Sequence, residues 1–280
     1  MVSSAAPSQV IERGTELPDS LSQAVRLEFG RAFHPPYEVP IVIAVNGVLM
    51  AGLWFLAPKA WDNALFSLHG TLAFPLLLAG WMISDVPATN VLGPDHRRTR
   101  VALDDPLMFR RLLHTKNLAF WVLAVPLCTA VTLGIALNDH DYVGLIVALV
   151  TLAVIPFGPL AIAAWVGVRF PYHPIPLRER WANRRSWKHF LFRWGVLVLT
   201  PYGLVPMLAT AIITPTLLFW GITEQHGLTH RVSDARFAWG MLLACGISVI
   251  VAIIGYQGSA RLARRRREKL STYLADPSLG

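Results

Sequence analysis

The chain has 280 residues, of which 54% are hydrophobic and 15% are charged. Soluble proteins carry roughly 25% charged residues, and here the charges are gathered between long apolar runs, so composition excludes an ordinary soluble domain and predicts an all-α, polytopic membrane protein. The net charge of +8 could indicate nucleic-acid binding. The Lys and Arg residues flank the apolar runs, however, which indicates contact with a lipid bilayer and not with nucleic acid.

The first 30 residues are polar and lack the apolar region of a cleavable signal peptide, so none is expected. Residues 1–18 are expected to form a flexible N-terminal tail. Residues 19–34 predict an amphipathic helix that lies in the membrane interface, because Ser20 and Gln23 fit a capping box. The apolar residues of this segment recur at helical spacing, at Leu21, Val25, Phe29 and Phe33.

Six apolar runs between residues 35 and 256 predict a domain of six transmembrane helices, since each approaches the roughly 20 residues that one span needs. The expected spans are 41–57, 64–84, 118–137, 143–168, 194–213 and 237–256. Pro156 near the middle of the fourth run predicts a kink. Residues 215–222 predict a hydrophobic excursion into the outer leaflet, and residues 257–280 a basic cytoplasmic tail.

The positions of the basic residues predict an orientation for these spans. The N-terminal region, segments 86–117 and 169–193, and the tail contain 22 of the 25 Lys and Arg residues. Because basic residues are enriched in cytoplasmic connections, both termini and these two segments are expected on the cytoplasmic side of the plasma (inner) membrane.

Residues 104–117 form a stretch that is too short and too charged to cross a membrane. Asp105 can cap a helix, and Pro106 suits the first helical position. One helical arc then carries Met108, Phe109, Leu112 and Leu113. The opposite arc carries Arg110, Arg111, His114 and Asn117, while Leu107 and Lys116 break the division. The pattern predicts a short cytoplasmic helix that presents a polar face to a partner.

Motifs that would make the chain an enzyme are missing from the sequence. It contains no Walker A pattern, no G-x-S-x-G and no H-E-x-x-H, so we expect a chain without a nucleotide or catalytic site that binds no cofactor or metal of its own. The turn at residues 138–141 has the composition of an acidic metal site, but it lacks a second acidic cluster and is expected to be a solvated turn. His226 and His230 are expected to be surface histidines, and Cys128 and Cys245 to be buried as apolar side chains.

Three further patterns leave alternatives open. Ala244, Ser248 and Ala252 recur at every fourth position, which allows close helix packing either within the chain or between two chains. The basic run 261–267 suits a lipid-facing anchor better than a partner contact. Segment 169–193, with its prolines and basic residues, could be a connector or a second partner-facing surface.

The order of these parts resembles that of the ABC-2 type exporter permeases. Locally, the stretch Asn90–Asp95, the Arg110–Leu113 run, the Lys116–Ala119 run and Pro126 look like the corresponding region of actinobacterial ABC exporter membrane subunits. The sequence Phe170-Pro171-Tyr172 is similar to a cytoplasmic connection in the same group. The residue-level likeness covers about 40 residues, and the architectural likeness covers nearly the whole chain.

The resemblance implies a permease half that works as a homo- or heterodimer with a second half. ATP would be bound by a separate cytoplasmic ABC ATPase, and the cargo would be amphipathic: a lipid, glycolipid, peptide or drug. The family's coupling helix would correspond to residues 104–117, with the ATPase contacting Asp104, Asp105, Arg110, Arg111, His114 and Lys116. The alternatives are a structural or accessory subunit of a larger membrane complex and, less favoured, a membrane enzyme acting on lipids.

Overall fold

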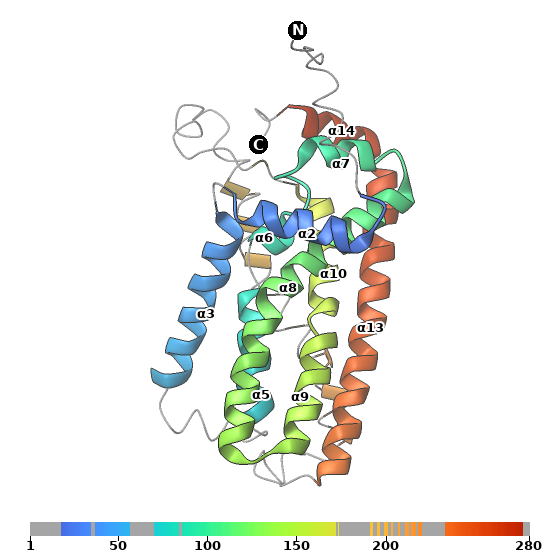
Figure 1. Cartoon of the computed structure of the whole chain (residues 1–280). Helices are drawn as coiled ribbons and strands as arrows, with labels where there is room; N and C mark the ends of the chain where they lie inside the picture. The colour runs from blue at the N-terminus through green and yellow to red at the C-terminus, as the bar shows by residue number, and fades with distance from the viewer. Residues whose placement is uncertain are drawn as a thin grey trace.

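The computed structural model describes residues 18–34, 37–56, 70–83, 86–171, 173 and 233–276, together with isolated residues between 191 and 219. Every regular element in this part of the chain is a helix (Figure 1). The all-α class that composition predicts is therefore confirmed for the described residues.

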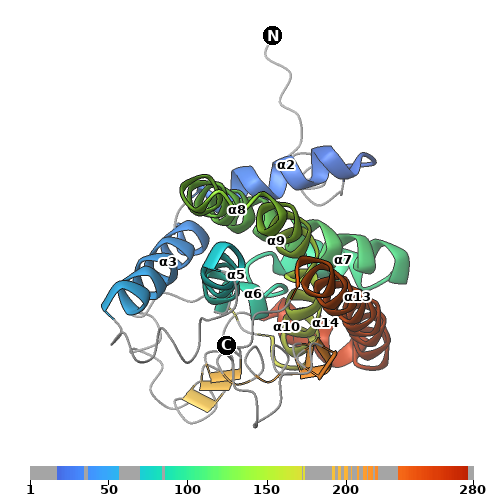
Figure 2. The ribbon, with the colours of Figure 1, turned by 90° about the horizontal axis from the view of Figure 1, so that it is seen from below.

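The longer helices run side by side as a bundle (Figures 1 and 2). They are α3 (Glu38–Leu56), α5 (Gly70–Met82), α8 (Pro106–Asp139), α9 (Tyr142–Val154), α10 (Phe157–Arg169) and α13 (Asp234–Arg265). Short helices lie across one end of this bundle: α2 (Leu21–Ala32), α6 (Val86–Thr89), α7 (His96–Ala102) and α14 (Arg267–Ala275). We call α2, α7, α14 and the first turns of α8 the platform.

Three helices of the described chain are long and apolar enough to cross a membrane: Pro106–Asp139, Tyr142–Arg169 and Ala235–Arg265. They correspond to the third, fourth and sixth predicted spans. The six predicted spans are not supported. Helices α3, with 19 residues, and α5, with 13 residues, are not among the three, and residues 57–69 between them are not described. The fifth predicted span and the predicted excursion fall where only isolated residues are described.

The predicted kink in the fourth span is confirmed. Helix α9 ends at Val154 and α10 begins at Phe157, with Pro156 between them. Proline has no backbone N–H to donate and its ring crowds the preceding turn, so the helix is interrupted there. The two segments together still count as one candidate span.

The prediction of a separate short helix at residues 104–117 is wrong. Helix α8 runs without interruption from Pro106 to Asp139, so the predicted short helix forms the first turns of the third span. No glycine or proline occurs between Leu107 and Val125 to stop it. Once nucleated, a helix extends through each further residue that tolerates helical geometry, and this one has no reason to end at Asn117.

The small residues of α13 pack inside the chain. Ala244 and Ser248 are fully buried, and the Ser248 hydroxyl donates to the Ile155 carbonyl at 2.8 Å. A Cβ at Gly255 would lie 2.9 Å from the Ala161 Cβ on α10, closer than such atoms normally approach. Of the two alternatives for this pattern, the structure therefore shows contact within one chain, where α13 lies against α10 (Figure 2).

The ends of the chain correspond only in part to the predicted segments. Helix α2 occupies the predicted interfacial segment, but the Ser20 side chain makes no capping bond and instead contacts the Ser22 hydroxyl at 2.7 Å, so the capping box is wrong. Helix α13 continues beyond residue 256 to Arg265 and is followed by α14, so the basic segment is helical. Residues 1–17 of the predicted 1–18 tail and most of segment 169–193 lie outside the described residues.

Candidate functional site

The first turn of α8 has the geometry that its sequence predicts. Asp105 is the N-cap residue, and its Oδ1 accepts a hydrogen bond from the Leu107 amide at 2.8 Å. Pro106 follows at the first helical position, where its missing N–H leaves no donor unpaired. The corner between α7 and α8 is thereby fixed at the very start of a helix that can cross the membrane.

The apolar arc of this stretch faces the protein interior. Phe109, Leu112 and Leu113 are buried, and Met108 packs against them. Their neighbours come from α7, α10, α13 and α14, including Ala102, Ala164, Tyr256 and Leu274. The first turns of α8 consequently share one hydrophobic cluster with residues of four other helices.

The polar arc is less available to a partner than the sequence predicts. Lys116 is only 9% exposed, and its ammonium donates to the Val91 carbonyl at 2.8 Å. Asn117 is fully buried and donates to the Leu160 carbonyl at 3.1 Å and to the Tyr256 hydroxyl at 2.8 Å. The His114 ring lies on the Tyr256 ring, with centroids 4.0 Å apart. Of these three residues, only His114 keeps an exposed surface.

The two arginines of the polar arc differ in their contacts. The Arg111 guanidinium donates to the Pro18 and Asp19 carbonyls, just before α2. Arg110 is partly buried. Because α2 packs against α8, the segment that precedes α2 occupies the side of α8 on which Arg111 lies.

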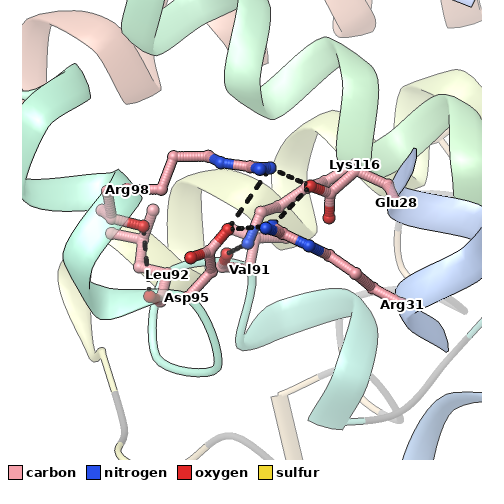
Figure 3. Close-up of polar contacts among 8 residues, drawn as sticks. Glu28, Arg31, Val91, Leu92, Asp95, Arg98 and Lys116 are labelled. Atoms are coloured by element: carbon pink, nitrogen blue, oxygen red, sulfur yellow. Dashed lines mark hydrogen bonds and ion pairs between the residues drawn. The ribbon is translucent and has the colours of Figure 1, made fainter. Parts of the chain in front are cut away.

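A charged cluster connects four parts of the chain: α2, α7, α8 and the loop that precedes α7 (Figure 3). Arg31 forms ion pairs with Glu28 at 3.3 Å and with Asp95 at 2.8 Å. Arg98 is only 1% exposed; it pairs with Glu28 and lies 3.5 Å from Asp95. The Lys116 ammonium lies beside this group. We call Glu28, Arg31, Asp95, Arg98 and Lys116 the charged junction.

Sequence reasoning missed the charged junction because it treated Arg98 only as a determinant of topology and assigned Lys116 to a contact with a partner. A signal was present: Glu28 with Arg31, and Asp95 with Arg98, are opposite charges three residues apart, which is the spacing of neighbours on one helical face. Buried charges are tolerated only when they are paired, so the junction attaches α2 firmly to α7 and α8.

The corner between α7 and α8 is the part of this site that is open to solvent. Val101 is 45% exposed and Leu107 is 72% exposed, and Arg97, Arg100 and Asp104, which are close to them in sequence, are exposed as well. Asp104 also pairs with Arg267 of α14, and both of these side chains are largely exposed. We call Arg97, Arg100, Val101, Asp104 and Leu107 the α7–α8 corner.

A ring cluster attaches α14 to α7. The His173 Nε2 lies 2.8 Å from the Tyr273 carbonyl, and its ring stacks on the Tyr273 ring with centroids 4.8 Å apart. The His96 ring meets the His173 ring edge-on at 5.8 Å. Burial lowers the pKa of His96, and the positive charges of nearby His173 and Arg97 lower this pKa further, so His96 resists protonation in the folded protein.

The remaining candidate ligand residues do not form a metal site within the described chain. In the described residues, no group of three or more His, Cys, Asp or Glu side chains could hold a metal ion. In the 138–141 turn, His140 adopts a left-handed conformation, and Asp141 caps α9 by accepting from the Gly144 amide at 2.8 Å. Cys128 and Cys245 are buried, as predicted, while His226 and His230 lie outside the described residues.

Searches against protein-family models, curated proteins and solved structures found no match to this chain.

Proposed function

We propose that this chain is the membrane-spanning permease subunit of an ATP-driven ABC exporter, which works with a second permease half and a separate cytoplasmic ABC ATPase. The observation that carries the proposal is the exposed α7–α8 corner at the start of α8. Any force applied there acts on one end of a continuous 34-residue helix that is long and apolar enough to span the membrane.

The physical argument begins with the energy source. The sequence contains no nucleotide-binding motif, so ATP energy would have to arrive through a contact surface. A docking surface needs exposed apolar groups rimmed by charge, and Val101 and Leu107 provide them beside Arg97, Arg100 and Asp104. The buried apolar arc of α8 would then carry a displacement of the corner to α10 and α13.

The structure changes which residues the proposal assigns to the ATPase contact. Lys116 is buried and Arg111 is engaged with the segment before α2, so both serve the platform itself. Asp104 and Asp105 are exposed at the corner, His114 is exposed beside Tyr256, and Arg110 is partly buried. We therefore centre the docking surface on the α7–α8 corner and place Arg110 and His114 at its edge.

The distribution of charged residues along the chain supports the proposed membrane orientation and the proposed class of cargo. The platform contains most of the basic residues in the described chain, so it is assigned to the cytoplasmic side of the plasma membrane, with both termini on that side. The candidate spans have almost no ionisable residues between their ends. An amphipathic cargo such as a lipid, glycolipid, peptide or drug suits such a path. The proposal also retains a permease half with six spans and a hydrophobic excursion into the outer leaflet.

The test is to purify the tagged chain from its native host and to identify any nucleotide-binding protein that accompanies it. We expect an ABC ATPase to copurify with the wild type and to be lost from the V101E/L107E double variant, because two carboxylates would face the centre of the docking surface. Lys269→Glu, a charge change at an exposed site on α14, serves as the control and should retain the ATPase.

Two results would contradict the proposal. A stable assembly that contains other membrane proteins but no nucleotide-binding partner would favour a structural or accessory subunit. Equal retention of an ATPase by the wild type and by V101E/L107E would remove the α7–α8 corner from the docking surface.

A further inference from the structure

An aromatic and basic surface lies where α10 and α13 approach the platform. Trp165 of α10 is 42% exposed, and a Cβ built on Gly258 of α13 would lie 3.4 Å from its Cδ1 atom. Three exposed arginines lie nearby in the sequence of the two helices: Arg169 of α10, and Arg261 and Arg265 of α13. The indole ring therefore lies within van der Waals reach of α13 at Gly258.

Helical spacing places these side chains on one face. At roughly 100° per residue, Gly258, Arg261 and Arg265 fall within about 60° of one another on α13, and the exposed Ile254 falls in the same arc. Arg169 follows Trp165 by four residues, one turn along α10. We call Trp165, Arg169, Ile254, Arg261 and Arg265 the α10–α13 face.

The two helices are fixed together at this level. The Arg266 guanidinium donates to the Val168 carbonyl at 3.4 Å and to the Arg169 carbonyl at 2.5 Å, the last carbonyls of α10. The backbone positions of Arg169 and Arg265 are therefore held beside each other, and the α10–α13 face is organised before any ligand arrives.

The depth of this face follows from the length of α13. No charged residue occurs between Arg236 and Arg261. That uncharged run is roughly 36 Å long at about 1.5 Å per helical residue, slightly more than the roughly 30 Å hydrocarbon core of a bilayer. Arg261 and Arg265 consequently fall at the level of lipid headgroups, with the exposed Ile250 and Ile254 at the level of acyl chains.

We propose that the α10–α13 face binds an anionic phospholipid such as phosphatidylglycerol. Arg261, Arg265 and Arg169 contact its phosphate, Trp165 lies at the boundary between headgroup and chain, and one acyl chain lies along Ile254 and Ile250. Guanidinium groups bind phosphate oxygens with two parallel hydrogen bonds, and tryptophan is enriched at this depth of a membrane. This site is separate from the proposed ATPase contact and does not depend on it.

The state of the neighbouring arginines supports this choice of ligand. Arg266 is used to hold the end of α10, and Arg267 pairs with Asp104. Within the described chain, Arg261 and Arg265 have no carboxylate within ion-pair distance, so their charge is available to an anion in the membrane interface.

The experiment measures lipid binding to the full chain, purified in its native assembly, by native mass spectrometry during titration with phosphatidylglycerol or phosphatidylcholine. We expect phosphatidylglycerol to be preferred. The R261Q/R265Q double variant should bind it roughly 30-fold more weakly, because each basic side chain near an anionic headgroup contributes a factor of about five. Arg169→Gln alone should lose roughly five-fold on the same basis.

Matched controls separate this site from general attraction to positive charge. R97Q/R100Q removes two exposed arginines from α7 and should leave phosphatidylglycerol binding unchanged. V101E/L107E should also leave phosphatidylglycerol binding unchanged, even if this variant loses a partner ATPase. If R261Q/R265Q does not fold, Arg265→Gln and Arg169→Gln provide the same comparison one residue at a time.

Three results would overturn the proposal. One is equal binding of phosphatidylglycerol by the wild type and R261Q/R265Q. Another is an equal loss in R97Q/R100Q, which would assign the effect to net charge. The third is full displacement of the lipid by millimolar inorganic phosphate, which would assign the site to a free anion.

Discussion

The charged junction and the α7–α8 corner contain the same kinds of residue and lie next to each other, yet they differ in what surrounds them. In the junction, Arg98 and Lys116 are buried, and Arg98 is paired with carboxylates from two elements. At the corner, Arg97 and Arg100 are exposed beside the exposed apolar side chains of Val101 and Leu107. Arg97 and Arg98 are adjacent in sequence, so a rotation of about 100° around α7 separates a structural arginine from an available one.

This difference decides what each region can do. Removing one partner of a buried ion pair leaves an uncompensated charge, whereas an exposed pair contributes little to stability. The junction therefore holds α2 on the platform, and the corner remains free to meet another protein. Four substitutions or pairs of substitutions test this contrast, from the largest expected effect to the smallest.

Arg98→Ala should give the largest effect. It removes the buried partner of Glu28, while Arg31 still pairs with Glu28 and Asp95, so the free energy of unfolding should fall by about 3 kcal/mol, the low end of the cost of breaking a buried ion pair. Arg97→Ala is the matched control and should change this free energy by less than about 0.5 kcal/mol. Denaturant unfolding of the purified proteins measures both free energies. Similar losses of free energy in the two variants would show that the buried and the exposed arginine contribute equally to stability.

Lys116→Met should have the next largest effect. The methionine fills a similar volume but cannot donate to the Val91 carbonyl, so we expect a loss of about 1–3 kcal/mol from the buried acceptor left unpaired. The same change at the exposed Lys269 should be almost silent. A Lys116→Met protein as stable as the wild type would show that the ammonium contributes nothing to the junction.

A fall in pH should weaken the contact between α7 and α14. Because the pKa of His96 is lowered below its ordinary value near 6.5, the unfolded chain binds a proton first as pH falls. The His96 contribution to stability is therefore complete above about pH 6.5 and is lost as pH falls toward the lowered pKa. Thermal melting from pH 7.5 to 5 should show a decline that is smaller in His96→Gln, and an unchanged decline in this variant would assign the effect to other groups.

Asp104→Asn should have the smallest effect. The ion pair between Asp104 and Arg267 is exposed, so breaking it should cost less than about 1 kcal/mol. A double-mutant cycle of Asp104→Asn with Arg267→Gln isolates the pair. A coupling energy as large as that of a buried pair would show that the corner is held as firmly as the junction.

The start of α8 could be predicted from its sequence because the signals are local. A capping aspartate, a proline at the first position and four apolar residues on one arc all act within three turns, and the structure has the cap at Asp105 and the arc buried. The break at Pro156 was equally local. The end of the predicted short helix was wrong because the change from polar to apolar residues was taken as a boundary, although nothing interrupts the backbone there.

The candidate site could be predicted only in part. The availability of Lys116 and Arg111 depends on α2 and the residues before it, which are about 90 positions away in the chain and occupy the space beside α8. No pattern within 104–117 carries that information. In the described part of the chain, three of the six predicted spans correspond to helices long and apolar enough to cross a membrane, and the other three predicted spans include residues that the structure does not describe.

The central claim is that a nucleotide-binding partner docks on the α7–α8 corner, and site-directed cross-linking tests it most directly. Both natural cysteines are buried, so Leu107→Cys introduces the reactive thiol, and Leu137→Cys, near the other end of α8 and also exposed, is its control. The claim predicts that Leu107→Cys, treated in native membranes with a short thiol–amine cross-linker, is joined to an ABC ATPase and that Leu137→Cys is not. Cross-links to other proteins only, or equal ATPase cross-links from both positions, would contradict it.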